Sequence, residues 1–318
     1  MIVALSLFIY GAMLAVLGPR LIGMLTAGRQ TPRLAVVTWQ IAAVSVVLAW
    51  AAGGVAMATP IPPVDALGHL LTSCITAVHE AAADPGGRVP QVVGLLLSSV
   101  VVARAVWCIT TAGISRGRWR QRHVRGLRIV AKPAPTLGAV VLDHPAAVAY
   151  CIPGRFRQTV LTRGALDVLA DDQLGAVLAH EQAHLRGRHD LALASIQALT
   201  CAFPRVPVLT AAAREIPVLL EMCADDAAAR RHGPAAVVGA LRVLSSRGSP
   251  EGTLAAGGSS APLRIVRLLS PRRHRLRSQV ALGSAAALLA AGPLIAATVP
   301  VLVVAAEFLR YCPIPPMA

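Results

Sequence analysis

Charged residues are scarce in this chain. Only 14% of its 318 residues are Asp, Glu, Lys or Arg, whereas a soluble globular protein carries roughly 25%. Hydrophobic residues make up 55% of the chain, and its mean hydropathy is +0.63. These values exclude the ordinary soluble protein of two domains that the length alone would suggest. The apolar residues are clustered, and clustering favours a membrane protein.

Acidic and aromatic residues are also few. The chain has 15 Asp and Glu against 30 Lys and Arg, so its formal net charge is +15. Lys132 is the only lysine, and the remaining basic residues are arginines. A surplus of this size occurs in nucleic-acid-binding proteins, but an aromatic content of 3% argues against base-stacking surfaces. No helix-turn-helix pattern is found either, so we expect no direct nucleic-acid partner.

Cysteine is limited to six residues, and no CxxC pair occurs among them. A zinc ribbon and a thioredoxin-type redox motif are therefore excluded. Cys74 and Cys312 fall on the side of the membrane where a disulfide persists, and whether they pair is left open.

Four runs with no charge, or with a single one, are long enough to cross a bilayer, which takes about 20 apolar residues. They cover about 1–19, 34–60, 91–112 and 278–305. The third run holds Arg104, for which snorkelling to the headgroups is favoured over a functional intramembrane charge. A cleaved signal peptide is the alternative for the first run. No Lys or Arg precedes that run, however, as the n-region of a signal would require.

The arginines gather in alternate connections between the apolar runs. They cluster between the first two runs, after the third and before the fourth, whereas the 61–88 loop carries three acidic residues and one arginine. By the positive-inside rule, the 19–33 loop and residues 116–277 are cytoplasmic. The 61–88 loop, the 306–318 tail and both termini are then extracytoplasmic. The predicted fold class is a multi-pass membrane α-helical protein with about four transmembrane helices and a cytoplasmic α+β domain.

Residues 116–277 combine short strands with longer helices. We expect strands at Leu137–Leu142, Ala147–Ile152 and Gln158–Thr162. Helical spacing begins after Asp171, a predicted N-cap, and a second helix is expected from Pro217 to His232, with Gly233 as its stop. The apolar stretch 191–203 is too short to span a bilayer and is either a core helix or a helix at the membrane surface.

The segment HEQAH places two histidines four residues apart on the first of these helices. His180 and His184 then share one helix face and can offer two imidazole nitrogens to a single metal ion. Glu181 lies about 100° further round the helix, where its carboxylate can reach a water molecule without binding the metal. This is the H-E-x-x-H pattern of zinc peptidases, and a chance occurrence is the alternative.

A catalytic zinc ion needs a third protein ligand and an open position for water. Glu221 is the candidate, because it stands in an apolar, alanine-rich part of the second helix, where an unpaired carboxylate is costly to bury. Asp225 follows one turn later on the same face and can accept a hydrogen bond from a ligand histidine. The alternative is that both belong to a solvated face, of which Asp226 and Arg230 are part.

Together, the segments VLAHEQAHLRGRHD and EMCADDAAARRHG are similar to the integral-membrane zinc metallopeptidases with HExxH and ExxxD motifs. They look most like the BlaR1/MecR1-type family M56, with the HtpX/Ste24-type family M48 as the near relative. The lead-in VLTRGALDVLADDQLGAVLAHE and the segment APLRIVRLLSP also resemble the family. The resemblance implies a zincin-like peptidase domain in a bacterial cell membrane, with one Zn2+ ion per chain. By resemblance, His180, His184 and Glu221 bind zinc, Glu181 is the catalytic base, and Asp225 supports a ligand histidine.

The resemblance also implies a protein or peptide substrate. Members of family M56 cleave a cytoplasmic transcriptional repressor, so that class of substrate is expected. The antibiotic-sensing members carry a penicillin-binding domain after the last span, whereas only FLRYCPIPPMA follows here; β-lactam sensing through such a domain is therefore not expected. The rival interpretations are HtpX-like quality control of membrane proteins and a catalytically silent membrane sensor or scaffold.

The residue that stabilises the oxyanion beside zinc is left open. His232 and Tyr150 are the candidates, although either is more often structural. The strand Ala147–Ile152 is a candidate edge strand for pairing with an extended substrate. His189 and Asp190 are expected to cap or flank the end of the HEQAH helix.

Overall fold

The structure is a computed structural model that describes residues 1–59, 88–155, 157–246, 260–270 and 275–311. Most of the predicted 61–88 loop, the last residues of the 306–318 tail, and both Cys74 and Cys312 lie outside the described residues.

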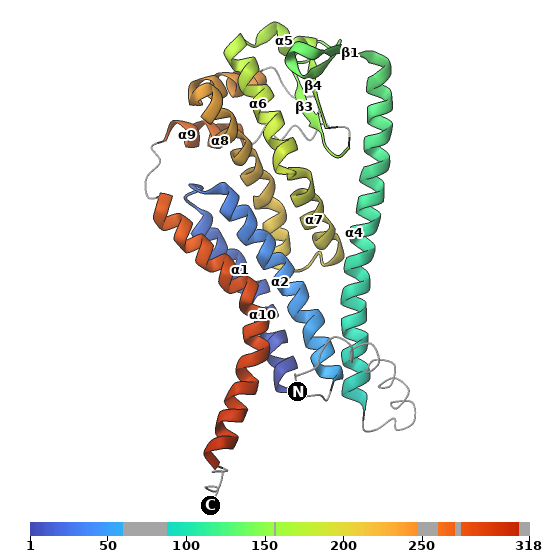
Figure 1. Ribbon diagram of the computed structural model, residues 1–318, viewed down its shortest axis with the longest axis vertical. Coiled ribbons are helices and arrows are strands. Elements are labelled where there is room, and N and C mark those ends of the chain that lie inside the picture. Colours follow the sequence, from blue (N-terminus) through green and yellow to red (C-terminus); the bar gives the residue numbers. More distant parts are fainter. Residues whose placement is uncertain (60–87, 156, 247–259, 271–274, 312–318) are drawn as a thin grey trace, which may run out of the picture.

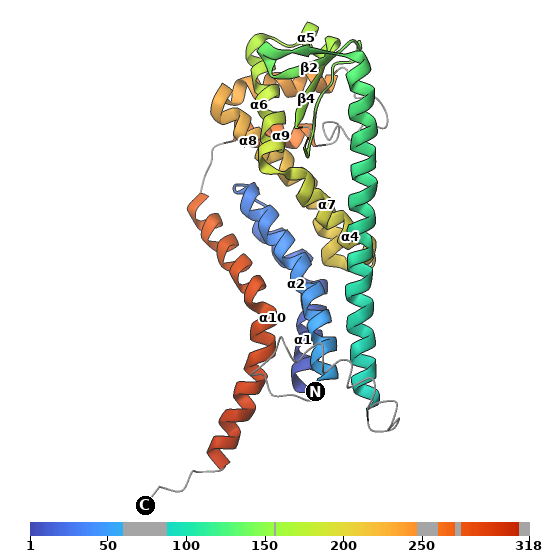
Figure 2. The same ribbon diagram turned by 45° about the vertical axis from the view of Figure 1, so that its right-hand side comes forward.

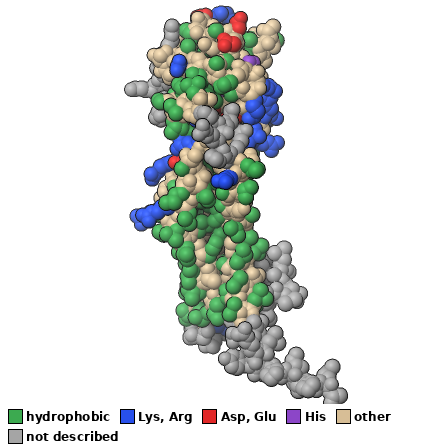
Figure 3. Space-filling view, turned by 90° about the vertical axis from the view of Figure 1, so that its left-hand side faces the viewer, with side chains coloured by type: hydrophobic (Ala, Val, Ile, Leu, Met, Phe, Trp, Pro, Cys, Tyr) green, Lys and Arg blue, Asp and Glu red, His purple; other side chains and the backbone are tan. Residues whose placement is uncertain are grey.

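Four long apolar helices form where the four apolar runs were predicted (Figure 1). They are α1 (Ile2–Thr26), α2 (Pro32–Ala58), α4 (Val89–Val130) and α10 (Arg275–Tyr311). Each is long and apolar enough to cross a membrane. On the face that Figure 3 shows, hydrophobic side chains cover much of the half away from the sheet, and Lys and Arg gather near mid-height and above.

Helix α4 joins the apolar half of the molecule to the sheet without a break (Figure 2). Its first part is apolar, and its second part carries the arginine cluster that follows the third run. The boundary expected at 115/116 is therefore a change of composition inside one helix of 42 residues. Near its end, Val124 and Leu127 are buried against the sheet.

The sheet has four strands in the order β1-β2-β4-β3, with β2 and β4 parallel and the other pairs antiparallel. The strands are β1 (Ala131–Ala134), β2 (Ala139–Leu142), β3 (Ala149–Ile152) and β4 (Gln158–Thr162). Strand β2 begins later than predicted because Pro135–Leu137 form a 3-10 turn that ends at Gly138, where φ is 60°. Strand β3 also begins later, because the Thr162 hydroxyl bonds the backbone of Ala146 and Val148.

The two faces of the sheet are covered by different helices. Helix α6 (Asp171–Gly187) packs on one face, where Leu161 and Val177 share a buried cluster. The end of α4 covers the other face, where it meets Val160. Strand β3 is left at an edge of the sheet beside α6, in the position predicted for an edge strand.

The remaining described helices lie between the sheet and α10 in the chain. They are α5 (Arg163–Val168), α7 (His189–Ala202), α8 (Pro207–Ser246) and α9 (Ala261–Leu269). Asp171 is the first residue of α6 rather than its N-cap, which is Ala170. Helix α8 starts at Pro207 and runs through Pro217, so it is longer than the predicted 217–232 helix. Gly233, with φ at 79°, interrupts it where the stop was expected.

Helix α7 and the first half of α8 form a hairpin that enters the group of long apolar helices. Ile196 and Leu209 of the hairpin are fully buried in one cluster with Trp39 and Val46 of α2. At the tip, the Phe203 ring meets Trp50 edge-on at 6.3 Å between centroids. Trp50 lies 18 residues beyond the start of α2, or about 27 Å along the helix axis. The stretch 191–203 is thus a core helix among the predicted spans.

Arg104 forms a hydrogen bond at the tip of this hairpin. Its Nε donates to the backbone oxygen of Ala202 at 2.5 Å, at the C-terminus of α7. A cation at this position satisfies a carbonyl that has no partner inside the helix. The Arg104 side chain thus bonds the α7–α8 hairpin, and its snorkelling to the headgroups stays a prediction.

Candidate metal centre

The centre forms where α6 packs along α8. Small side chains line this contact, and Ala176, Ala179, Ala228 and Ala229 are all buried in it. Alanine side chains let two helices approach closely, because nothing larger than a methyl group separates the backbones. The alanine-rich sequence of both helices therefore brings the HEQAH face of α6 against the Glu221 face of α8.

His180, His184 and Glu221 converge at this contact, and among the described residues they form a group that could hold a metal ion. The two Nε2 atoms lie 3.1 Å apart, and each lies 3.4 Å from a Glu221 carboxylate oxygen. A tetrahedral ion with ligands at about 2.0–2.1 Å separates its ligand atoms by about 3.3 Å. These separations therefore suit a zinc ion held by the three side chains, whose imidazole nitrogens and carboxylate oxygens are donors that zinc takes in proteins.

Both histidines use their second ring nitrogen for a contact behind the centre. His180 Nδ1 lies 3.1 Å from Asp225 Oδ1, which is the partner expected from the sequence. His184 Nδ1 lies 2.9 Å from His189 Nδ1. Such partners fix the orientation and tautomer of a ligand imidazole. His189, expected only to flank the helix end, thus also contacts a candidate ligand.

Arg264 of α9 holds the two acidic residues of α8 together. It binds Asp225 through Nε at 2.7 Å and Nη2 at 2.6 Å, and its Nη1 lies 3.1 Å from Glu221. Asp225 is completely buried, and the Arg264 side chain is 3% exposed. A buried carboxylate needs such a partner, and the two-pronged geometry is the one that arginine gives to a carboxylate.

The charges of the centre are set by burial and by these contacts. Burial alone would raise the pKa of Glu221, but its hydrogen bond to His180 and the Arg264 charge prevail and lower that pKa to about 2. Burial and the neighbouring His180 lower the pKa of His184 to about 3, so its ring is neutral, as metal binding requires. Burial likewise disfavours a charge on His180, yet hydrogen bonds to Asp225 and Glu221 raise its pKa to about 10. A metal ion would replace the proton that His180 holds toward Glu221.

Glu181 lies beside the three candidate ligands and faces the edge strand. Burial raises the pKa of its carboxyl, while the neighbouring His180 opposes that rise. A hydrogen bond with the Cys151 thiol of β3 also links the carboxyl to the sheet. A glutamate with a raised pKa is suited to take a proton and return it.

Tyr150 faces away from the centre. Its hydroxyl lies 2.9 Å from His123 Nε2 of α4, and it packs with the cluster on that face of the sheet. Successive side chains of a strand point to opposite faces, so Cys151 and Tyr150 cannot both face Glu181. The structure does not support the candidate oxyanion role of Tyr150.

His232 is also remote from the centre. It is exposed and lies against Gly175, near the start of α6, where a Cβ would come within 2.7 Å of its ring. It follows Glu221 by 11 residues of α8, or about 16 Å along the axis. The structure therefore offers no oxyanion role for His232 either.

The sequence analysis assigns no role to Arg264 or Cys151 and does not expect His189 to bind the metal. A role for Cys151 could have been inferred, because one of the two adjacent strand residues Tyr150 and Cys151 must face α6. Arg264 was signalled only indirectly, by the need of a buried Asp225 for a cation.

Residues 115–224 match peptidase family M48. No curated protein and no solved structure matches the chain. The matched segment covers about a third of the chain and contains His180, Glu181, His184 and Glu221. It supports a metallopeptidase domain related to the membrane-type zinc enzymes. The match names the family expected as the near relative, and assignment to family M56 stays a prediction.

Proposed function

We propose that this chain is a membrane-embedded zinc endopeptidase that cleaves protein substrates at the cytoplasmic surface. The observation that carries the proposal is the convergence of His180, His184 and Glu221 at distances suited to zinc, with Glu181 beside them. The match of residues 115–224 to family M48 supports a metalloprotease. The four long apolar helices support the membrane placement.

The cytoplasmic location rests on charge. The chain reverses between α1 and α2, and again at the sheet, on the side where arginines gather. The N-terminus and the end of α10 lie at the opposite end of the molecule (Figures 1 and 2). Together with the positive-inside rule, this arrangement supports our proposal that the metal centre lies on the inner side and both termini outside.

His180, His184 and Glu221 would hold a zinc ion, which when bound would supply a Lewis acid for the scissile carbonyl and for a water molecule. The Glu181 carboxylate would accept a proton from the attacking water and return it to the leaving amine nitrogen. Asp225 and His189 hold the ring nitrogens of the two histidines, and Arg264 holds Asp225 and Glu221 in place. The edge of β3, which pairs with no second strand among the described residues, can pair with an extended substrate and bring the substrate backbone past Glu181.

We propose that the substrate is a cytoplasmic protein such as a transcriptional repressor, and that its cleavage belongs to a signalling response. A second candidate, quality control of membrane proteins, is favoured by the position of the centre. Glu221 lies six residues beyond Glu215, which pairs with Arg29 in the α1–α2 turn. That spacing is about 9 Å along α8, so the centre stands close to the level at which the two spans end. A bond near the end of a substrate's own span would be within reach.

The test compares purified full-length protein with Glu181→Ala and with Asp172→Ala, a matched change at an exposed carboxylate of α6. We expect one zinc ion per chain in all three. Cleavage of a casein or peptide-library substrate should fall by about 100- to 10,000-fold in Glu181→Ala only, since the general base is lost. Full cleavage by Glu181→Ala would refute the mechanism, and a folded wild type without zinc would refute the centre. Comparing a soluble repressor with a misfolded membrane protein as substrates then separates the two candidate classes.

A further inference from the structure

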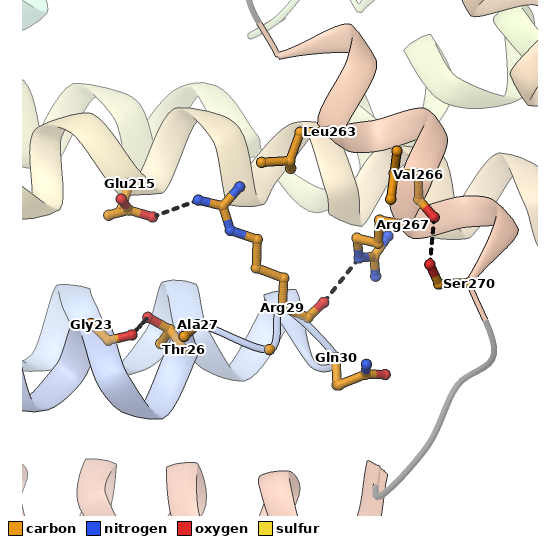
Figure 4. Close-up of a pocket in the computed structure, with 11 residues that line it drawn as sticks. Gly23, Thr26, Ala27, Arg29, Gln30, Glu215, Leu263, Val266, Arg267 and Ser270 are labelled. Atoms are coloured by element: carbon orange, nitrogen blue, oxygen red, sulfur yellow. Dashed lines mark hydrogen bonds and ion pairs between the residues drawn. The ribbon is translucent and has the colours of Figure 1, made fainter.

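A pocket with a volume of about 580 Å³ lies between the end of α1, the α1–α2 turn, α8 and α9 (Figure 4). Its polar side chains include Arg29, Glu215 and Arg267, and its apolar wall includes Leu263 and Val266. The metal centre takes no part in its lining. The pocket therefore needs an explanation separate from catalysis.

The cationic side of the pocket is built around Arg29. This residue has φ at 46°, in the left-handed region that non-glycine residues rarely adopt. Its N–H donates to Thr26 O at 2.9 Å, and its carbonyl accepts from Arg267 Nε at 2.9 Å. The turn is thus fixed from both sides with the Arg29 side chain directed across the pocket toward Glu215 (Figure 4).

The guanidinium of Arg29 is held only loosely. Its contact with Glu215 is 3.6 Å long, and the two side chains are 25% and 38% exposed. A pair of this length and exposure contributes little, so an incoming anion can take the place of the Glu215 carboxylate. Arg267 is engaged by Asp226 at 2.7 Å and by the Arg29 carbonyl, and it serves to fix the wall of the pocket.

The other side of the pocket is an apolar helix face. Leu263, Val266 and Leu269 of α9 follow each other at intervals of three residues and are 40%, 65% and 61% exposed. The opposite face of α9 buries Arg264 and Leu268. A short helix with an outward apolar face beside cationic side chains is typical of a segment at a membrane interface.

We propose that this pocket binds an anionic phospholipid of the inner leaflet, with its phosphate on Arg29 and its acyl chains along the exposed face of α9. The inference rests on the proposed membrane placement, in which the α1–α2 turn joins two spans at headgroup level. An amphiphile with a negative head matches a cation and an apolar face that lie side by side. A free anion such as phosphate would match the Arg29 cation but not the apolar face of α9.

The lipid would act on the metal centre through α9. Arg264, which binds Asp225 and Glu221, and Val266, which lines the pocket, stand two residues apart on a helix of nine residues. A ligand that holds α9 in place also holds Arg264 against Asp225 and against Glu221, one of the proposed zinc ligands. Bound lipid is therefore expected to slow the loss of zinc.

The test uses full-length Glu181→Ala protein, so that self-cleavage cannot interfere. It is placed in nanodiscs of phosphatidylcholine with or without about a third phosphatidylglycerol, a composition that makes the surface anionic. Native mass spectrometry measures the lipid retained, and a chelator measures zinc release. We expect retained phosphatidylglycerol and zinc release about five- to tenfold slower with it, the size of a typical coupling between sites.

Arg29→Gln should lower phosphatidylglycerol retention about tenfold, as loss of one charged contact implies, whereas Arg29→Lys should retain most of it. Arg20→Gln, at an exposed arginine of α1 outside the pocket, is the matched control and should behave as the parent. Equal retention by Arg29→Gln and the parent would overturn the lipid site, as would inorganic phosphate alone slowing zinc release in phosphatidylcholine. Lipid retention is measured both with and without zinc, so that a failure of zinc binding can be told apart from a failure of lipid binding.

Discussion

Replacing Arg264 by leucine tests how the metal centre is held together. The change leaves Asp225, which is completely buried, with His180 as its remaining charged partner, and it removes a 3.1 Å contact from Glu221. Removing one partner of a buried ion pair costs about 3–5 kcal/mol, because the other charge stays in a poorly solvated place. Loss of the support behind a metal ligand lowers metal affinity by about 10- to 100-fold. We expect both effects in the purified full-length protein.

The assays are thermal unfolding in detergent and zinc competition with a chelator. Arg242→Leu, at an exposed arginine of α8, is the control and should change neither. The double variant Arg264→Leu with Asp225→Asn should lose much less stability than the sum of the single variants, since it leaves no unpaired charge. If the stability lost by the double variant equals the sum of the two single losses to within about 0.5 kcal/mol, Arg264 and Asp225 do not act as a pair and the reasoning is refuted.

Three further changes probe other contacts. His189→Phe removes the partner of a ligand ring nitrogen and should weaken zinc binding about tenfold in the same competition assay; unchanged affinity would leave the histidine without a supporting role. Tyr150→Phe should leave kcat unchanged and lower stability by about 1 kcal/mol, for one lost hydrogen bond, whereas a hundredfold fall in kcat would restore Tyr150 as a catalytic candidate. Mild oxidation should link Cys108 of α4 to Cys201 of α7, whose sulfur atoms lie 3.5 Å apart, and mass spectrometry of digests should find the linked peptides; their absence would contradict the position of the hairpin.

The parts of the centre that lie within one helix were predictable from the sequence. His180, Glu181 and His184 keep their relation wherever α6 packs, because a helix fixes residues four apart on one face. Glu221 is 37 positions beyond His184, and its place depends on two alanine-rich helices packing together. The sequence allowed that packing, and the cost of a buried carboxylate singled out the residue.

The remaining parts depended on tertiary structure that no local pattern encodes. Arg264 reaches Asp225 from a helix 39 residues away, and its spacing carries no sign of that partner. For β3, alternation required one of Tyr150 and Cys151 to face α6, but which one depends on the register that pairs Tyr150 with Val160. The stretch 191–203 was ambiguous because an apolar segment suits a protein core and a lipid surface equally.

The α7–α8 hairpin also bears on the order in which the protein can be assembled. Its buried residues, such as Ile196, Leu209 and Ile216, share their cluster with α1 and α2, which leave the ribosome first, and with Leu282 of α10, which leaves last. Helix α8, which carries Glu221, therefore completes its packing only after α10 has been made. A chain still being synthesised would lack the final packing around α8, so on the proposed function we expect no cleavage before α10 has packed.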